Sequence, residues 1–85
     1  MVLLSTKTVK TIKPHRCMGC VKTIPPGTRV LREVVVDGNE IWTVYICEIC
    51  QDIIAEHEID EFSEGDIIRN YTHEYNARKA HHVKN

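Results

Sequence analysis

Two short segments determine the fold expected for this chain: CMGC at residues 17–20 and CEIC at residues 47–50, separated by 26 residues. Each segment places two residues between its cysteines, and a tight turn of that length directs both sulfurs towards one point. Two such pairs supply four thiolates for one tetrahedral ion, with Zn–S distances of about 2.3 Å. We therefore expect a single structural Zn²⁺ ion bound by Cys17, Cys20, Cys47 and Cys50.

Other uses of four cysteines fit the sequence less well. Two disulfides require an oxidising compartment, and the apolar start at residues 1–4 is too short for the core of a signal peptide. A redox dithiol accounts for one pair only, and the paired spacing favours a single ion over an iron–sulfur cluster. A catalytic zinc keeps one position open, whereas four thiolates close the shell. His15, close to the first pair, is a candidate partner or substitute for a ligand sulfur.

The length and composition limit the class of protein. A chain of 85 residues forms one domain with a marginal apolar core. Its content of 42% hydrophobic and 27% charged residues excludes a disordered chain, a collagen-like repeat and a coiled coil. No apolar run approaches the roughly 20 residues of a membrane span, so we expect no membrane partner and a cytoplasmic protein. A structural zinc ion commonly supplies about 10–16 kcal/mol to the folding of such small domains.

A β-hairpin is the secondary structure that the sequence indicates most directly. Residues 29–36 and 41–46 are rich in β-branched and aromatic side chains, and Gly38-Asn39 between them fits a two-residue hairpin turn. This turn places Val36 opposite Ile41 and Val35 opposite Trp42.

The other expected elements are one strand and two helices. Residues 6–13 alternate in part between polar and apolar and predict an edge strand, where lysines discourage unwanted pairing. Helical spacing from Ile49 to His57 predicts a helix that begins at the second cysteine pair. A second helix is predicted over residues 64–80, with Ser63 and Asp66 resembling a capping box. The result is one small α+β domain, with an N-terminal strand and arm (1–15), a core (16–60) and a C-terminal helix and tail (63–82).

The order of these elements resembles that of treble-clef zinc fingers from Arg16 to about His57, close to half of the chain. The chain also resembles small CxxC…CxxC proteins of bacteriophages and bacteria, in which the turn before the hairpin commonly reads Ile-Pro-x-Gly, here residues 24–27. The resemblance implies a treble-clef-like core with one structural zinc held by the four cysteines, and the host cytoplasm for a phage-encoded protein. Val21 departs from the pattern, because zinc knuckles often have glycine directly after the second cysteine.

Acidic residues gather in the middle of the chain. Residues 37–66 hold ten Asp and Glu and no Lys or Arg. This block is either a solvated face that keeps a small protein soluble, or a surface that docks a basic partner or occupies a site made for nucleic acid. We expect its acidic side chains along the outer face of the first helix at four-residue steps, and two tyrosines of the second helix either pack in the core or anchor a partner. The candidate partner-binding residues are Glu48, Asp52, Glu56, Asp60, Glu61, Tyr71 and Tyr75.

Basic residues gather in the N-terminal third. Residues 1–36 hold seven Lys and Arg and one Glu. These bases either contact phosphates of a nucleic acid or pair with the acidic helix. The isoelectric point near 6.5 is unusual for a nucleic-acid module. The candidate nucleic-acid residues are Lys7, Lys10, Lys13, Arg16, Lys22, Arg29 and Arg32.

These patterns favour a non-catalytic, zinc-stabilised interaction module, such as a phage-type accessory protein that binds and modulates a cytosolic protein through an acidic helical surface. The alternative is a nucleic-acid-binding regulator that uses the basic N-terminal third. We do not expect an enzyme: the nucleases among treble-clef proteins carry a His-rich catalytic stretch, and residues 28–50 contain no histidine. A homodimer is a further option, because domains of this size often gain stability by oligomerising.

Overall fold

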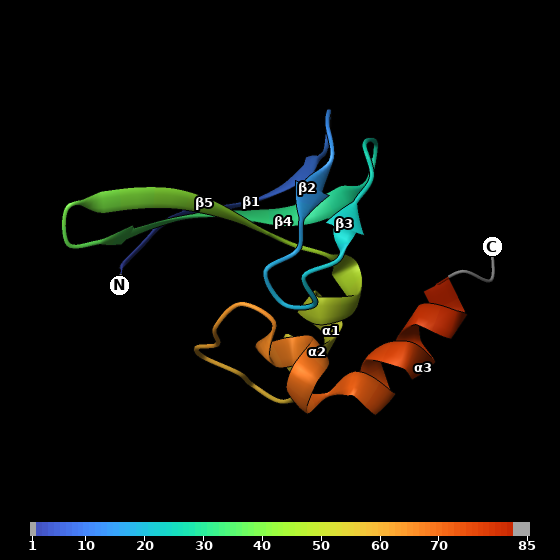
Figure 1. Cartoon of the computed structure of the whole chain (residues 1–85). Helices are drawn as coiled ribbons and strands as arrows, with labels where there is room; N and C mark the ends of the chain where they lie inside the picture. The colour runs from blue at the N-terminus through green and yellow to red at the C-terminus, as the bar shows by residue number, and fades with distance from the viewer. Residues whose placement is uncertain (1, 83–85) are drawn as a thin grey trace.

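The protein is a small α+β domain in which a long antiparallel sheet stands over three helices (Figure 1). The computed structural model describes the backbone of residues 2–82 and the side chains of residues 3–80. A three-stranded sheet has the order β1-β4-β5, and a short two-stranded sheet pairs β2 with β3. The elements are β1 (Val2–Lys10), β2 (His15–Arg16), β3 (Thr23–Ile24), β4 (Arg29–Asp37), β5 (Glu40–Ile46), α1 (Glu48–Glu56), α2 (Asp66–Asn70) and α3 (Thr72–His82).

The hairpin of β4 and β5 confirms the predicted register. Val35 pairs with Trp42, and Val36 pairs with Ile41. Gly38 lies in the connecting turn with a φ of 66°, a left-handed conformation that glycine adopts without steric cost. Local turn chemistry and alternation therefore specify this part of the fold.

Strand β1 is an edge strand, as predicted, but it occupies residues 2–10 rather than 6–13. It pairs with β4 over its whole length, with one irregularity between Leu3 and Ser5. The strand ends at Thr11, a buried side chain that turns towards the loop after β3. The Thr11 hydroxyl donates to the Pro25 carbonyl over 2.9 Å and accepts the Thr28 N–H over 3.0 Å. These bonds fasten the end of β1 to the Pro-Gly turn and prevent its continuation.

Helix α1 begins at Glu48, within the second cysteine pair as predicted and with Cys47 as its N-cap, but it ends earlier than the acidic pattern suggested. The Ile59 N–H bonds to the Ile54 carbonyl over 3.0 Å, and the Glu58 N–H bonds to the Ala55 carbonyl over 3.4 Å. Glu58 has a φ of 50°, so this ending is a Schellman motif with glutamate where glycine is usual. The prediction that Asp60 and Glu61 lie on the first helix is therefore wrong. Both residues belong to the loop that follows it.

The helix predicted over residues 64–80 is two helices, α2 and α3, with a break at Tyr71 (φ −129°, ψ 35°). At the break, the hydroxyl of Thr72 donates to the Ile68 carbonyl, a local bond that competes with regular helix geometry. Before α2, the Asp66 carboxylate accepts the Ser63 N–H over 2.7 Å, which is one half of the predicted capping box. The position directly before the helix is taken by Gly65, not Ser63.

The core lies at one end of the long sheet, where the cysteines, β2–β3 and the helices meet. Here the sheet is covered on both faces, and Val30, Ile46 and Ile53 are fully or almost fully buried. The other end of the sheet extends away from the helices as a free arm (Figure 1), which helps to give the molecule a longest dimension of 41 Å. On this distal arm Ile41 is 66% exposed and Leu3 is 52% exposed. No helix in the described part of the chain is long and apolar enough to cross a membrane.

Candidate metal centre

The four cysteines converge at the junction of the sheet and α1. Cys17 and Cys20 lie in the turn between β2 and β3, Cys47 follows directly on β5, and Cys50 lies in the first turn of α1. Their sulfurs all lie within 4.8 Å of one another. The Cys17 and Cys50 sulfurs are 3.7 Å apart, and those of Cys20 and Cys47 are 3.9 Å apart.

These distances fit one tetrahedral metal ion. A tetrahedron with Zn–S distances near 2.3 Å holds its sulfurs about 3.8 Å apart. A disulfide would need about 2.05 Å, and all four cysteines are free thiols. Cys17, Cys20 and Cys50 are buried, and Cys47 is half-buried. The group can therefore hold one ion in a closed, four-sulfur shell.

The turn that carries the first pair has the hydrogen bonds of a compact knuckle. The Val21 N–H donates to the Cys17 carbonyl over 2.9 Å, and the Cys17 N–H donates to the Lys22 carbonyl over 3.0 Å. Val21 has a φ of 53°, so it adopts the left-handed conformation for which zinc knuckles often use glycine. For a β-branched residue this conformation is strained. The departure noted in the sequence thus changes the residue but keeps the turn.

Gly19 is required by close packing rather than by its backbone angle. A Cβ at this position would lie 2.8 Å from the Cys50 sulfur and 3.0 Å from Cγ1 of Ile67. The backbone of the knuckle also receives α2: the Gly19 carbonyl accepts the Ile68 N–H over 3.1 Å. Any side chain at residue 19 would push the second cysteine pair or α2 away from the first pair.

Hydrogen bonds among the four thiols shift the pKa values of the cysteines in opposite directions. Hydrogen bonds from Cys17, Cys47 and Cys50 lower the pKa of the Cys20 thiol. Hydrogen bonds with Cys17, Cys20 and Cys47 raise the pKa of the Cys50 thiol. The backbone also contributes, since the Cys47 N–H donates to the Cys17 sulfur over 3.4 Å. Because thiolates are the ligands of the metal, binding of an ion would release the remaining thiol protons.

Tyr75 and Lys22 lie beside the cluster, and no sequence pattern predicts this position for either. Tyr75 is only 3% exposed. Burial and the neighbouring Cys20 sulfur raise the pKa of its phenol, which therefore stays protonated and available as a donor to sulfur. The Lys22 ammonium lies 5.4 Å from the centre of the Tyr75 ring. Groups of this kind around a ligand orient it and offset its negative charge. His15, a predicted neighbour of the sulfurs, stacks instead on Tyr45 with ring centres 3.8 Å apart.

The predicted partner surface does not form one continuous face. Glu48, Asp52 and Glu56 are exposed on α1, but Glu56 forms an ion pair with Arg78 of α3. Glu74 of α3 bonds to His57 over 2.7 Å, so α3 covers part of α1.

The two tyrosines of the predicted surface face inwards. The Tyr71 ring packs against His57 with ring centres 4.6 Å apart and is half-buried, and Tyr75 is in the core. Burial supports the core-packing interpretation of Tyr75, and its side chain offers no surface to a partner. The exposed acidic side chains are therefore the members of the predicted set that remain available for contact.

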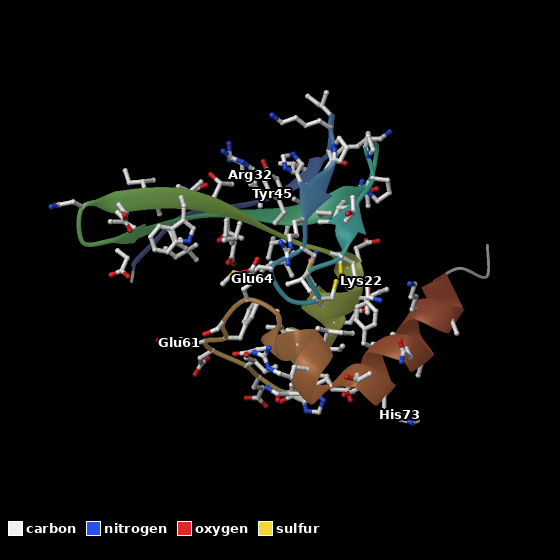
Figure 2. All side chains as sticks on the ribbon, viewed as in Figure 1. Lys22, Arg32, Tyr45, Glu61, Glu64 and His73 are labelled. Atoms are coloured by element: carbon white, nitrogen blue, oxygen red, sulfur yellow. The ribbon has the colours of Figure 1, made fainter. Side chains whose placement is uncertain are left out.

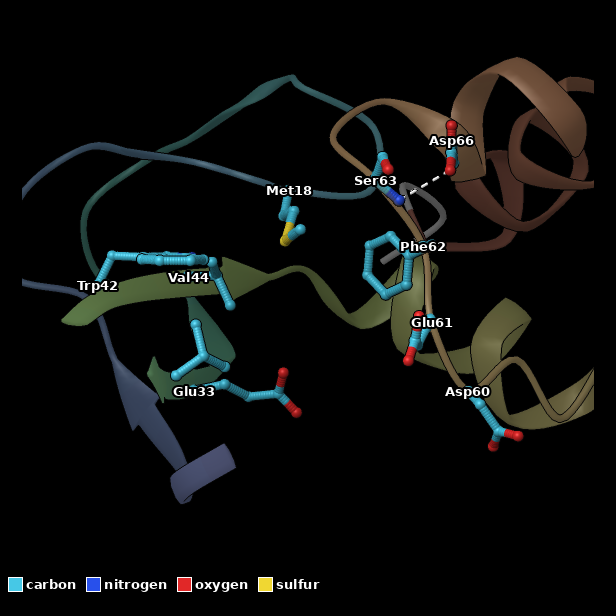
Figure 3. A pocket seen from close by; sticks show the side chains of 10 residues that line it. Met18, Glu33, Trp42, Val44, Asp60, Glu61, Phe62, Ser63 and Asp66 are labelled. Carbon is cyan, nitrogen blue, oxygen red and sulfur yellow. Dashed lines mark hydrogen bonds between the residues drawn. The ribbon is translucent and has the colours of Figure 1, made fainter. Parts of the chain in front are cut away.

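Asp60 and Glu61 line a cleft that the sequence did not reveal. It has a volume of about 350 Å³ and lies between the sheet and the loop after α1 (Figure 3). Glu33 of β4, 27 residues before Asp60, and Asp66 of α2 are further carboxylates at this cleft. Asp66 accepts the Ser63 N–H and pairs with Arg69. Glu33, Asp60 and Glu61 have no hydrogen bond or ion pair with any residue that the structure describes. The cleft is also lined by Met18, Val35, Trp42, Val44, Phe62 and Ser63. It is called the acidic cleft below.

The basic residues of the N-terminal third do not pair with α1. Within the described residues, only Arg16 of this group forms an ion pair, with Glu64 at 3.7 Å, and both side chains are exposed. Lys22 lies at Tyr75 near the metal centre. Lys7, Lys10, Lys13 and Arg32 line a common groove on the sheet. The structure thus divides the predicted nucleic-acid residues among separate places.

No protein family, curated protein or solved structure matches this chain.

Proposed function

We propose that this protein is a zinc-stabilised, non-catalytic interaction module of the treble-clef type, which binds a basic segment of a partner protein. The architecture supports the first part of this proposal. A cysteine knuckle between β2 and β3, the hairpin β4–β5 and a helix that starts at the second cysteine pair follow one another in treble-clef order. Four thiolates suit zinc and leave no open position for a substrate.

The observation that carries the second part is the acidic cleft, where unpaired carboxylates stand beside aromatic and aliphatic side chains. Glu33, Asp60 and Glu61 provide negative charge, while Trp42 and Phe62 provide apolar surface. A lysine or arginine side chain has the matching construction, with an aliphatic stem and a cationic head. Its head would meet the carboxylates while its stem and the aromatic faces exclude water.

Each contact of this kind contributes little alone. Exposed ion pairs are worth about 0.2–1 kcal/mol, and an exposed cation–π contact about 0.5–1 kcal/mol. A specific complex therefore needs several contacts together. We expect single substitutions in the acidic cleft to have small effects and the combined substitution of its three unpaired carboxylates to have a clear one.

Trp42 allows a direct test because it is the only tryptophan of the chain and lies in the acidic cleft. The zinc-loaded protein is titrated with a nine-residue peptide that contains three arginines, and tryptophan emission is recorded. We expect saturable quenching or a spectral shift. The triple variant Glu33→Gln, Asp60→Asn, Glu61→Gln should bind this peptide at least tenfold more weakly.

The matched control removes three exposed carboxylates outside the cleft: Glu40→Gln, Glu48→Gln and Glu58→Gln. It has the same net charge as the triple variant, so a general charge effect would weaken both proteins equally. A second control peptide replaces the arginines with glutamines. Equal weakening by the two triple variants, or equal binding of the two peptides, contradicts the assignment of the cleft to a basic segment.

A further inference from the structure

Two cross-strand pairs between β1 and β4 place like charges opposite one another. Lys7 pairs with Arg32, and Lys10 pairs with Arg29. Like charges directly opposite in a sheet are destabilising, whereas opposite charges stabilise it. Neither pair has a carboxylate partner in the part of the chain that the structure describes. Alternation points the two pairs to opposite faces of the sheet, so an anionic ligand on the face of Lys7 and Arg32 would relieve the repulsion of that pair.

A groove of about 480 Å³ on the side of the sheet opposite the acidic cleft is lined by Lys7 and Arg32, and by Lys10 at the end of β1. Alternation separates the two sides, because Arg32 and Tyr45 point away from their neighbours Glu33 and Val44. Figure 2 shows Arg32 and Tyr45 on one side of the sheet and Glu61 on the other. The lining residues, here called the basic groove, are Lys7, Val9, Lys10, Thr11, Ile12, Lys13, His15, Arg32 and Tyr45.

Apolar and aromatic surface lies directly beside these charges. His15 and Tyr45 form a stack with ring centres 3.8 Å apart and an interplanar angle of 22°. Ile12, between Lys10 and Lys13, is 92% exposed. A cationic site made only to hold a small anion would not need this surface. Single-stranded nucleic acid, in contrast, combines a phosphate chain with unpaired bases whose flat faces stack on such side chains.

We infer that the basic groove binds single-stranded nucleic acid, with Lys7, Lys10, Lys13 and Arg32 contacting phosphates and Ile12 and the His15–Tyr45 stack contacting bases. A duplex hides the faces of its stacked bases, so it would contact only the charged side chains of the groove. The basic groove lies on the opposite side of the sheet from the acidic cleft, so this inference can be tested independently of the proposed function.

The test measures binding of a fluorescent 12-nucleotide oligodeoxythymidine to the zinc-loaded protein over a range of salt concentrations. Four phosphate contacts predict a slope of log affinity against log salt of about −3, because each contact on a single strand contributes about −0.7. The double variant Lys7→Gln, Arg32→Gln should bind at least tenfold more weakly at low salt. Its slope should be shallower by about 1.4, since two contacts are lost.

A matched control is Lys79→Gln, which removes one exposed positive charge from α3, to be compared with Lys7→Gln alone. We expect the control to change affinity less than twofold. The melting temperature of the double variant without nucleic acid is a second readout. It should stay the same or rise, because a like-charge pair is removed, whereas residues with a structural role would lower it.

Three results would overturn the inference. One is an unchanged affinity and salt slope in the double variant. Another is tighter binding of a 12-base-pair duplex than of the single strand, which would assign the groove to duplex. The third is equal binding of a polyglutamate peptide, which would assign it to an acidic protein. Titration with the arginine peptide should be unaffected by Lys7→Gln and Arg32→Gln, so that failure here is distinguishable from failure of the acidic cleft.

Discussion

The two ends of the long sheet have similar sequences and very different surroundings. At the cysteine end, Val30 of β4 is fully buried and Ile46 of β5 is 2% exposed. At the distal arm, Ile41 of the same strand β5 is 66% exposed. Both ends consist of β-branched and apolar residues in one continuous hairpin. Strand propensity therefore forms the hairpin, but what covers it decides which end belongs to the core.

The covering elements are the ones that carry the cysteines. The knuckle docks against β5, where the Met18 N–H donates to the Tyr45 carbonyl over 2.9 Å. Helix α1 starts from Cys47 at the end of the same strand. Both elements contribute sulfurs to the four-cysteine cluster, so an ion bound there would join them to the buried half of the sheet. We expect stability to be concentrated there and substitutions on the distal arm to matter little.

The largest expected effect is that of removing the ion. Structural zinc commonly supplies about 10–16 kcal/mol, which equals or exceeds the ~5–15 kcal/mol by which domains are stable. The variant Cys50→Ser, or the protein in a strong chelator, should lose its cooperative melting transition. Circular dichroism with native mass measurement of zinc content tests this. A metal-free protein that melts cooperatively at the original temperature would show that the core does not depend on the cluster.

The second effect compares one side chain at each end of the sheet. Ile53 of α1 is fully buried against the cysteines, and Ile41 is on the distal arm. Truncation of a buried isoleucine to alanine costs about 2–5 kcal/mol, while exposed positions change stability by less than about 0.5 kcal/mol. Urea unfolding of the zinc-loaded variants Ile53→Ala and Ile41→Ala should show this difference. Similar losses would mean that the distal arm is covered in solution, for example by a second copy of the chain.

The third effect is the difference between alanine substitutions at two glycines. Gly19→Ala places a Cβ within 2.8 Å of the Cys50 sulfur, whereas Gly38 has open space around it and only a positive φ. Overpacking costs about 1–3 kcal/mol, and a left-handed alanine about 1–2 kcal/mol. Gly19→Ala should weaken zinc affinity in a competition with a chelating dye, and Gly38→Ala should lower the melting temperature without changing that affinity. Equal zinc affinities would remove the role given to Gly19.

The smallest effect is a pH dependence away from the cluster. The hydrogen bond from His57 lowers the pKa of the Glu74 carboxyl below its usual value near 4.5, and Arg78 adds to this. A carboxyl whose pKa is depressed by folding stabilises the protein above its unfolded pKa and loses this contribution as the pH falls through the folded value. The melting-temperature difference between the wild type and Glu74→Gln should therefore be present at pH 7 and shrink below about pH 4.5. A melting-temperature difference that stays constant with pH at equal zinc content would contradict a stabilising contact between His57 and Glu74.

The sequence predicts well what local spacing controls. Each cysteine pair, the hairpin register and the start of α1 follow from residues close together in the chain. The end of α1 did not follow, because Glu58 takes the left-handed position usually marked by glycine. The acidic cleft could not be predicted either. Glu33 joins Asp60 and Glu61 only through tertiary packing, and no spacing rule connects residues on a strand and in a distant loop.

Cys47 directly follows β5 and directly precedes α1, so the four sulfurs lie where the distal arm of the sheet joins the helices. From this junction the arm extends to Gly38, about 30 Å at the rise of an extended strand. A rotation of the arm by about 5° at the junction would move its tip by roughly 2.5 Å over that length. Because Glu33 belongs to the sheet while Asp60 and Glu61 belong to the loop after α1, such a rotation would change the width of the acidic cleft without any change in the residues that line it.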